Sequence, residues 1–272
     1  MSNTVGVIIA GLDPFYLDLL RGIEITADEQ GTLLFIVDAS DSEARARTAI
    51  RQLTARGVQG IIGVSAGGAD QDPSDGSMPP IVYVDQPQRR GNVLLFNFEK
   101  AAGDAARHML GHGHRRIGYI TPPLEHPNIR ELFDGHRRAM SEAGVAFDPE
   151  LLVLVESFRL GSGGVGLATL RDRPTPPSAV IVNGGEVTLG VLREAHRRGL
   201  RIPDDLAILG YGDINASQLT SPALTMVSLP VYEIGVAAMR ALQRMMADPA
   251  TPSRRVVFDG TLVVRESCGR HS

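Results

Sequence analysis

One serine lies in a pattern that hydrolytic enzymes use. Ser65 is the centre of Gly63-Val64-Ser65-Ala66-Gly67, which fits the G-x-S-x-G pattern of a nucleophile elbow. In that elbow a strained turn from a strand into a helix exposes the serine hydroxyl for attack on a carbonyl. Here the run 67–73 contains Gly-Gly and ends in Pro, so it cannot continue as a helix. A serine hydrolase is the third alternative, and we favour a strand-end serine that faces a ligand.

A glycine pattern offers a second kind of chemistry. Residues 161–166 read Gly-Ser-Gly-Gly-Val-Gly and satisfy G-x-G-x-x-G, in which glycines let a pyrophosphate approach the start of a helix. A dinucleotide site also needs an acidic residue at the end of a second strand about twenty positions later. The chain instead continues through arginines and prolines. We therefore predict a permissive loop that enters a helix, and no cofactor.

Three histidines could bind a metal ion if a further ligand joined them. His108 and His112 would share a helix face, and His114 follows closely. Gly113 lies where that helix should end, and polar or positive side chains suit a helix C-terminus. We predict a surface helix end and no metal site.

These residues belong to a chain in which short apolar runs alternate with helical periodicity. The apolar runs are typical of strands buried on both faces of a sheet. They cover 5–10, 33–37, 60–64, 81–84, 117–120, 151–155, 179–182 and 206–209. The helical segments include 16–27, 102–110 and 234–245. Strands that alternate with helices predict an α/β protein with mostly parallel, doubly wound sheets.

Two lobes fit this length better than one. After Val64 the chain passes through a Gly-, Asp-, Ser- and Pro-rich loop at 66–80 to the next strand without a convincing helix. The alternation restarts past Phe98, so we place a lobe boundary there.

Composition excludes several classes of protein. The formal net charge is −4 and the pI is near 6.0, which argues against a nucleic-acid-binding face in these 272 residues. Cys268 is the only cysteine, and no apolar run reaches the ~20 residues that cross a bilayer. We expect a cytoplasmic protein with no membrane contact.

The strand ends supply the candidate binding residues. Ligands of open α/β sheets bind beyond the carboxyl ends of the strands, where aromatic rings, amides, carboxylates and arginines can stack against and hydrogen-bond a sugar or nucleobase. The candidates are Asp13, Phe15, Tyr16, Ser65, Asp85, His126, Asn128, Arg130, Phe158, Asn183, Tyr211 and Asp213.

Several segments, in this order, resemble the effector-binding core of LacI/GalR transcriptional regulators. The chain opens with Gly6-Val7-Ile8-Ile9 and Asp13-Pro14-Phe15-Tyr16, then has Gly113-His114-Arg115-Arg116-Ile117-Gly118-Tyr119-Ile120. The most specific stretch runs from Pro203 to Pro230 and includes Leu209-Gly210-Tyr211-Gly212-Asp213, and Glu266-Ser267 closes the match. Together these segments span nearly the whole chain.

The resemblance implies a periplasmic-binding-protein-like fold of type I with a ligand cleft between two lobes. Residues 1–97 plus 231–252 would form the N-terminal lobe, and 98–230 plus 253–272 the C-terminal lobe. It also implies a homodimer that contacts operator DNA through a helix-turn-helix headpiece preceding Met1. We expect that headpiece to be absent from this chain.

Three positions depart from the family pattern. Leu132 stands where the family usually has an arginine, Asn183-Gly184-Gly185 replaces a pair ending in Asp, and Gly212 replaces the first Asp of a Tyr-Asp-Asp motif. Asp85, which matches a ligand-contacting aspartate, is retained. Losing such polar contacts would change which ligand is bound.

The sequence therefore predicts a sensor with no enzymatic activity. A small polar metabolite, sugar-like or nucleoside-like, would bind in the cleft and shift the balance of two lobe arrangements. The second alternative is the solute-binding protein of a sugar transporter, which has the same fold.

Overall fold

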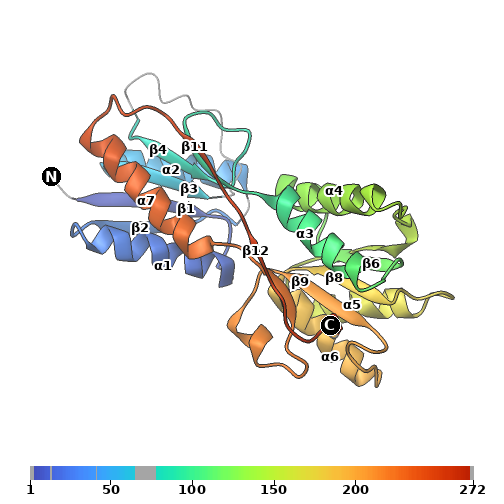
Figure 1. The fold of residues 1–272 in the computed structure, drawn as a ribbon. Helices are drawn as coiled ribbons and strands as arrows, with labels where there is room; N and C mark the ends of the chain where they lie inside the picture. The colour runs from blue at the N-terminus through green and yellow to red at the C-terminus, as the bar shows by residue number, and fades with distance from the viewer. Residues whose placement is uncertain (1–2, 13, 41, 65–77, 270–272) are drawn as a thin grey trace. The chain divides into compact units, whose positions relative to one another are not determined.

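The chain forms two compact units in a computed structural model that describes residues 3–12, 14–40, 42–64 and 78–269 (Figure 1). Unit 1 contains residues 1–96 and 230–258, and unit 2 contains 97–229 and 259–272. Each unit has one six-stranded sheet with helices packed against it, so the α/β prediction is confirmed. The expected lobe limits need one correction, because residues 255–258 pair with Asn92–Phe96 and belong to unit 1.

The sheet of unit 1 is entirely parallel and has the order β11-β5-β4-β3-β1-β2. Its elements are β1 (Thr4–Ile9), α1 (Pro14–Asp28), β2 (Leu33–Asp38), α2 (Glu43–Ala55), β3 (Gly60–Val64), β4 (Ile81–Val84), β5 (Asn92–Phe96), α7 (Val231–Ala247) and β11 (Arg255–Phe258). Residues of β1, β3, β4 and β5 are buried throughout, which explains why the sequence shows them as continuous apolar runs.

Helices cover both faces of this sheet. A Cβ added at Gly6 would lie 2.6 Å from Leu53 of α2, and one added at Gly60 would lie 2.7 Å from Leu242 of α7. Helix α7 packs closely against α1, because a Cβ at Gly22 would lie 2.2 Å from the carbonyl oxygen of Tyr232. The strand-end residues of unit 1 are therefore carried by a sheet that is packed on both sides.

Unit 2 repeats the architecture with the order β12-β10-β9-β8-β6-β7, in which only β12 is antiparallel to its neighbour. Its elements are α3 (Phe98–Gly111), β6 (Ile117–Thr121), α4 (Pro127–Glu142), β7 (Leu152–Leu154), α5 (Leu160–Arg171), β8 (Ala179–Asn183), α6 (Gly185–Arg197), β9 (Ala207–Tyr211), β10 (Thr225–Ser228) and β12 (Thr261–Val263), with short 3₁₀ turns at Pro149–Leu151 and Asn215–Gln218. Helices α3 and α4 pack together, as do α5 and α6.

The glycine pattern at 161–166 lies inside helix α5, so the prediction of a loop at these positions is wrong. Its glycines allow α5 and α6 to approach closely. A Cβ at Gly163 would lie 1.9 Å from the carbonyl oxygen of Val187, and one at Gly190 would lie 1.9 Å from that of Leu160. Backbone contact of this kind leaves no room for a side chain at either position.

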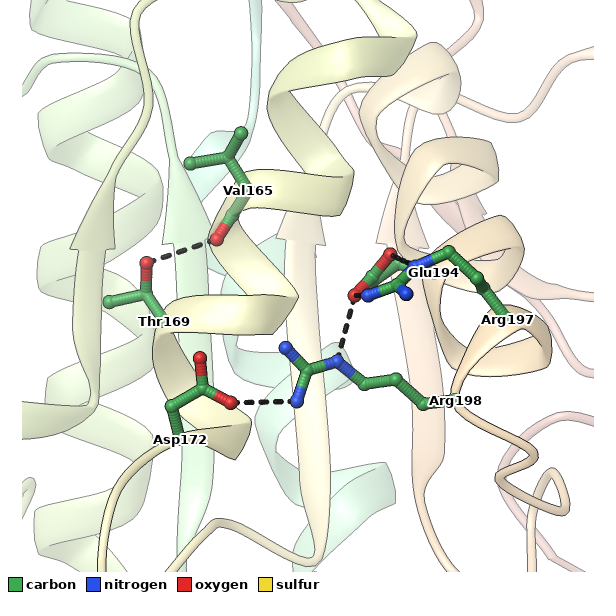
Figure 2. A network of polar contacts seen from close by, with 6 residues as sticks. All are labelled: Val165, Thr169, Asp172, Glu194, Arg197 and Arg198. Carbon is green, nitrogen blue, oxygen red and sulfur yellow. Dashed lines mark hydrogen bonds and ion pairs between the residues drawn. The ribbon is translucent and has the colours of Figure 1, made fainter.

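An ion-pair network joins the C-terminal ends of α5 and α6 (Figure 2). Arg198 donates from Nε to Glu194 Oε1 and from Nη1 to Asp172 Oδ1, both at 2.7 Å. Arg197 also donates to Glu194, through Nη2 at 2.6 Å. The guanidinium groups of Arg197 and Arg198 lower the pKa of Glu194 to about 2. The side chain of Arg197 is exposed, whereas those of Arg198 and Glu194 are partly buried.

A buried histidine lies in the core between the sheet of unit 2 and α4. The ring of His136 lies 4.9 Å from that of Tyr119 and 5.7 Å from that of Phe147, and the residue is fully buried. Neither ring nitrogen has a hydrogen-bond partner among the described residues. Burial lowers the pKa of His136 to about 3, so the imidazole is neutral near pH 7.

Helix α3 ends at Gly111 with His112 as its C-cap, so the predicted helix end is confirmed. No group of three His, Cys, Asp or Glu side chains in the described part of the chain could hold a metal ion. Within the same ranges, no helix is both long and apolar enough to cross a membrane.

Candidate functional site

Aromatic residues gather where β1 of unit 1 ends and α1 begins. Phe15 and Tyr16 are half-buried in the first turn of α1, with their rings 5.2 Å apart in an edge-to-face arrangement. Phe15 also lies 5.7 Å from Phe96 at the end of β5, so two strand ends contribute to one aromatic cluster. Asp13 and Ser65, which the sequence also places at these ends, lie outside the described residues.

Asp85 follows β4 directly and continues the ladder to β5. Its backbone amide donates to the carbonyl oxygen of Leu94 at 2.8 Å. Its φ is +56°, in the left-handed region that side chains other than glycine rarely adopt. Strain of this kind often occurs at binding sites, so Asp85 stays a candidate for ligand contact.

In unit 2, the start of α4 carries three of the predicted residues. His126 is the N-cap residue but makes no side-chain cap hydrogen bond. Asn128 Oδ1 accepts from the amide of Ile129 at 2.8 Å, and the side chain of Arg130 is exposed. All three follow β6 at the carboxyl end of the sheet.

Phe158 follows β7 and Asn183 ends β8, the two strands on either side of β6 in the same sheet. Phe158 is 42% exposed, and its Cδ1 would lie 2.8 Å from a Cβ added at Gly184. The ring therefore takes the space that a side chain at position 184 would fill. Asn183 is buried, and its Nδ2 donates to Thr121 Oγ1 at 3.3 Å. The partly exposed ring of Phe158 could stack against a ligand, whereas the amide of Asn183 is buried and already donates to Thr121.

The glycines that replace the expected aspartates are packed against one another. A Cβ at Gly185 would lie 2.5 Å from the carbonyl oxygen of Gly212 and 2.9 Å from Ile214. Gly212 has φ +79° but an open Cβ direction, since its nearest neighbour is the Gly185 nitrogen at 3.6 Å. Leu132, at the expected arginine position, is buried in α4. These three positions therefore offer backbone atoms or packed apolar atoms instead of charges.

Two predicted residues serve other purposes in the structure. Tyr211 is buried at 3% exposure in the core, where burial raises the pKa of its hydroxyl. Both carboxylate oxygens of Asp213 accept from Arg265, at 3.0 Å and 2.6 Å. Neither side chain is presented at the strand ends as the sequence analysis expected, because one fills the core and the other neutralises a partly buried cation.

Unit 2 also contains a cavity of about 910 Å³, at the opposite edge of its sheet. It is lined by residues that precede β6, β9 and β10 and by the C-terminal segment: His112, His114, Pro203, Asp204, Pro222, Arg265, Glu266, Cys268 and Gly269. Burial, and the nearby His112, lower the pKa of His114. Because open α/β sheets bind ligands at the carboxyl ends, we place the candidate site at the strand ends and not in this cavity.

The sequence places Gln86 at the strand end after Asp85 but does not indicate that its side chain is buried. Arg89 is also buried beside β3 and β4, although the Arg89-Arg90 pair reads as part of a solvated face, so that interpretation is wrong for Arg89. No local pattern signals either burial.

The fold agrees with comparisons to known proteins. The family described as periplasmic binding protein-like domain matches residues 106–268. The HTH-type transcriptional repressor CytR of Escherichia coli strain K12 is 31% identical over 275 residues, covering 98% of this chain and 79% of the relative. Catabolite control protein A of Priestia megaterium is 28% identical and covers 98% and 82%.

Solved structures show the same architecture. A LacI-family regulator of Enterococcus faecium with bound ribose has a TM-score of 0.87 at 24% identity, covering 99% of this chain and all of that one. At that identity the likeness shows the fold alone. A putative LacI-family regulator of Sanguibacter keddieii has a TM-score of 0.86 at 28% identity, with 98% and 99% covered.

These findings define the class of protein as periplasmic-binding-protein-like. Within it, the chain belongs to the LacI family of transcriptional regulators and forms the family's effector-binding core. The predicted resemblance is confirmed. The transporter alternative is not favoured, because the relatives named above are regulators.

Proposed function

We propose that this chain senses a small polar metabolite, of the sugar or nucleoside type, through residues at the carboxyl ends of its strands. The observation that carries the proposal is Phe158, a 42% exposed ring held against Gly184 at the start of α6. Phe15, Tyr16 and Asp85, at the strand ends of unit 1, are further candidates for effector contact. Support comes from the ribose bound to the Enterococcus faecium structure and from the Ribose operon repressor of Escherichia coli, a 27% identical relative.

Gly185 and Gly212 affect which class of metabolite the site can bind. Carboxylates at positions 185 and 212 would accept hydrogen bonds from sugar hydroxyls, but here only backbone atoms are present. A ligand with an aromatic face can still stack on Phe158 and does not need those acceptors. Within the proposal, we therefore rank nucleosides and nucleobases above simple polyols.

A thermal-shift screen tests this proposal. The panel contains D-ribose and other sugars, polyols, nucleosides, nucleobases and sugar acids. A compound at 100 times its Kd adds about 2.7 kcal/mol to the free energy of unfolding, which gives a clear rise in Tm. The same compound should give a smaller rise with Phe158→Ala. If no compound in the panel raises the Tm, the proposed effector class is wrong.

We also propose that the regulator acts as a cytoplasmic homodimer without enzymatic activity. The edge strand β2 exposes three large apolar side chains, Leu33 at 70%, Phe35 at 47% and Ile36 at 51%. A second copy of the chain would cover them. Operator DNA would be bound by a headpiece outside these 272 residues, which fits their formal charge of −4.

Sedimentation equilibrium tests the dimer. Phe35→Lys should shift the protein toward monomers, because a cation would have to be buried against the partner. Val257→Lys is the matched control, since Val257 is 53% exposed on β11 at the opposite edge of the same sheet. A monomeric wild-type protein, or dissociation of the Val257 variant alone, would contradict this assignment.

A further inference from the structure

The conformation of Asp85 has a cause in its neighbours. An aspartate at φ +56° costs about 1 kcal/mol relative to right-handed or extended backbone, the low end for a residue other than glycine, and surrounding contacts offset this cost. The ladder bond from Asp85 to Leu94 holds one side of the residue. On its other side the chain enters a turn in which Gln86 makes buried contacts.

The side chain of Gln86 crosses from the turn after β4 to the end of β3. Its Nε2 donates to the carbonyl oxygen of Gly63 at 3.0 Å. Its Oε1 accepts from Arg89 Nε at 3.0 Å. Gln86 is only 2% exposed, so both hydrogen bonds are shielded from water. This one side chain ties two strand ends and the turn together.

Arg89 closes the turn on itself. Its backbone amide donates to the carbonyl oxygen of Gln86 at 3.0 Å, and its guanidinium carbon lies 5.4 Å from the centre of the Tyr83 ring. Arg89 is 8% exposed, and Tyr83 is 7% exposed. We call Gln86, Arg89 and Tyr83 the bracket.

Gly63 lies next to this arrangement. A Cβ at Gly63 would lie 3.5 Å from Gln86 Nε2 and 3.7 Å from the Tyr83 ring, both ordinary contact distances. The amide of Gln86 therefore packs against the backbone of β3. The bracket is therefore built into the end of the sheet and is not a loop resting on its surface.

We propose that Gln86 is a positioning residue for effector binding: its buried side chain, through Gly63 and Arg89, holds Asp85 in the left-handed conformation that presents its carboxylate at the strand end. The inference rests on the proposed function, because it assumes that Asp85 contacts the effector. It goes further by assigning a role to a residue that does not itself touch the ligand.

The first experiment tests, without any ligand, whether the bracket holds the backbone conformation of residue 85. In a crystal structure of Gln86→Met, residue 85 should leave the left-handed region. Asp85→Gly should raise the Tm of the wild-type protein by about 2–4 °C, since glycine adopts this φ without strain. The same change in the Gln86→Met background should give a smaller rise. An equal rise in both backgrounds would overturn the bracket.

The second experiment reads binding by calorimetric titration. The probe is the panel compound with the largest thermal shift, with D-ribose titrated first. Gln86→Met should weaken binding about tenfold, because the carboxylate is no longer preorganised. Gln88→Met is the matched control, because Gln88 is exposed in the same turn. The affinity of this variant for the probe should stay within about twofold of that of the wild type.

The outcomes separate this inference from the proposed function. If Asp85→Asn weakens binding and Gln86→Met does not, the positioning role is wrong while the effector proposal stands. If no panel compound binds the wild-type protein, the proposed function fails, and the positioning role fails with it. The crystal structure and the Tm values still report whether the bracket holds residue 85.

Discussion

Alanine at position 185 and aspartate at position 212 should affect stability differently, although both positions are glycine at the same strand ends. A Cβ at residue 185 would lie 2.5 Å from the Gly212 carbonyl oxygen and 2.9 Å from Ile214. Backbone must move to accommodate it, so Gly185→Ala should cost about 2–3 kcal/mol, the upper part of the range for overpacking.

Gly212→Asp meets no such obstacle. The nearest atom to its Cβ is the Gly185 nitrogen at 3.6 Å, an ordinary contact. The cost is the left-handed φ of +79°, about 1–2 kcal/mol and at the low end for aspartate. Helix α6 begins at Gly185 without a side-chain cap. A carboxylate next to this helix N-terminus should stabilise the protein by about 0.3–1 kcal/mol, which offsets part of that cost. The net loss should be about 1 kcal/mol or less.

Urea unfolding at pH 7.5, followed by circular dichroism, measures both free energies of unfolding. Gly212→Ala is the control for Gly212→Asp, since it has the same φ strain but no carboxylate. The reasoning is refuted if Gly185→Ala is as stable as the wild-type protein, or if Gly212→Asp is less stable than Gly212→Ala.

Three further predictions follow from the packing of unit 2. Gly163→Ala should lower the free energy of unfolding by about 2–3 kcal/mol, while Gly164→Ala, whose nearest contact is 3.8 Å away, should be neutral or stabilising by up to about 1 kcal/mol in the same urea assay. Burial holds the pKa of His136 near 3, below its unfolded value, so its contribution to stability is present above pH 6.5 and is lost as the pH falls toward 3. Between pH 7.5 and 5.5 this loss is about 1.4 kcal/mol, and His136→Leu should lack it. Asp213→Asn should cost about 2 kcal/mol, because it leaves the Arg265 charge without its partner, and should leave effector affinity unchanged in a calorimetric titration. The packing argument is wrong if Gly164→Ala is destabilised. The assignment of the pH dependence to His136 is wrong if His136→Leu shows the same pH dependence as the wild type. The structural role of Asp213 is wrong if Asp213→Asn weakens effector binding.

The sequence predicts the fold well where burial is complete. Strands such as Thr4–Ile9 and Ala179–Asn183 are buried on both faces and show as unbroken apolar runs. Edge strands are harder to recognise. Arg255–Phe258 is mostly exposed and begins with arginine, so nothing local assigns it to unit 1, and only its pairing with Asn92–Phe96 does so.

Glycine was the least predictable residue type. The run at 161–166 reads as a loop because its intrinsic helix propensity is poor. In the structure the run is helical, and Gly163 lies so close to the Val187 carbonyl of α6 that no side chain would fit, a contact between segments far apart in the sequence. Tertiary packing overrides local preference here.

The sequence places the candidate residues at strand ends but does not give the direction of each side chain. Phe158 and Asp85 keep partly exposed side chains there. Asn183 and Tyr211 are buried, and Asp213 pairs with Arg265, 52 residues later. Side-chain direction at a strand end depends on partners that local patterns do not reveal.

The measurement that tests the central claim most directly is a calorimetric titration of the best panel compound into wild-type protein and into Phe158→Ala. Loss of stacking should weaken binding by about 1–3 kcal/mol, or roughly 5- to 150-fold. A Leu154→Ala variant, which changes an exposed apolar side chain on β7, should bind as the wild type does. Equal affinity of the wild-type protein and Phe158→Ala would contradict an effector site at these strand ends.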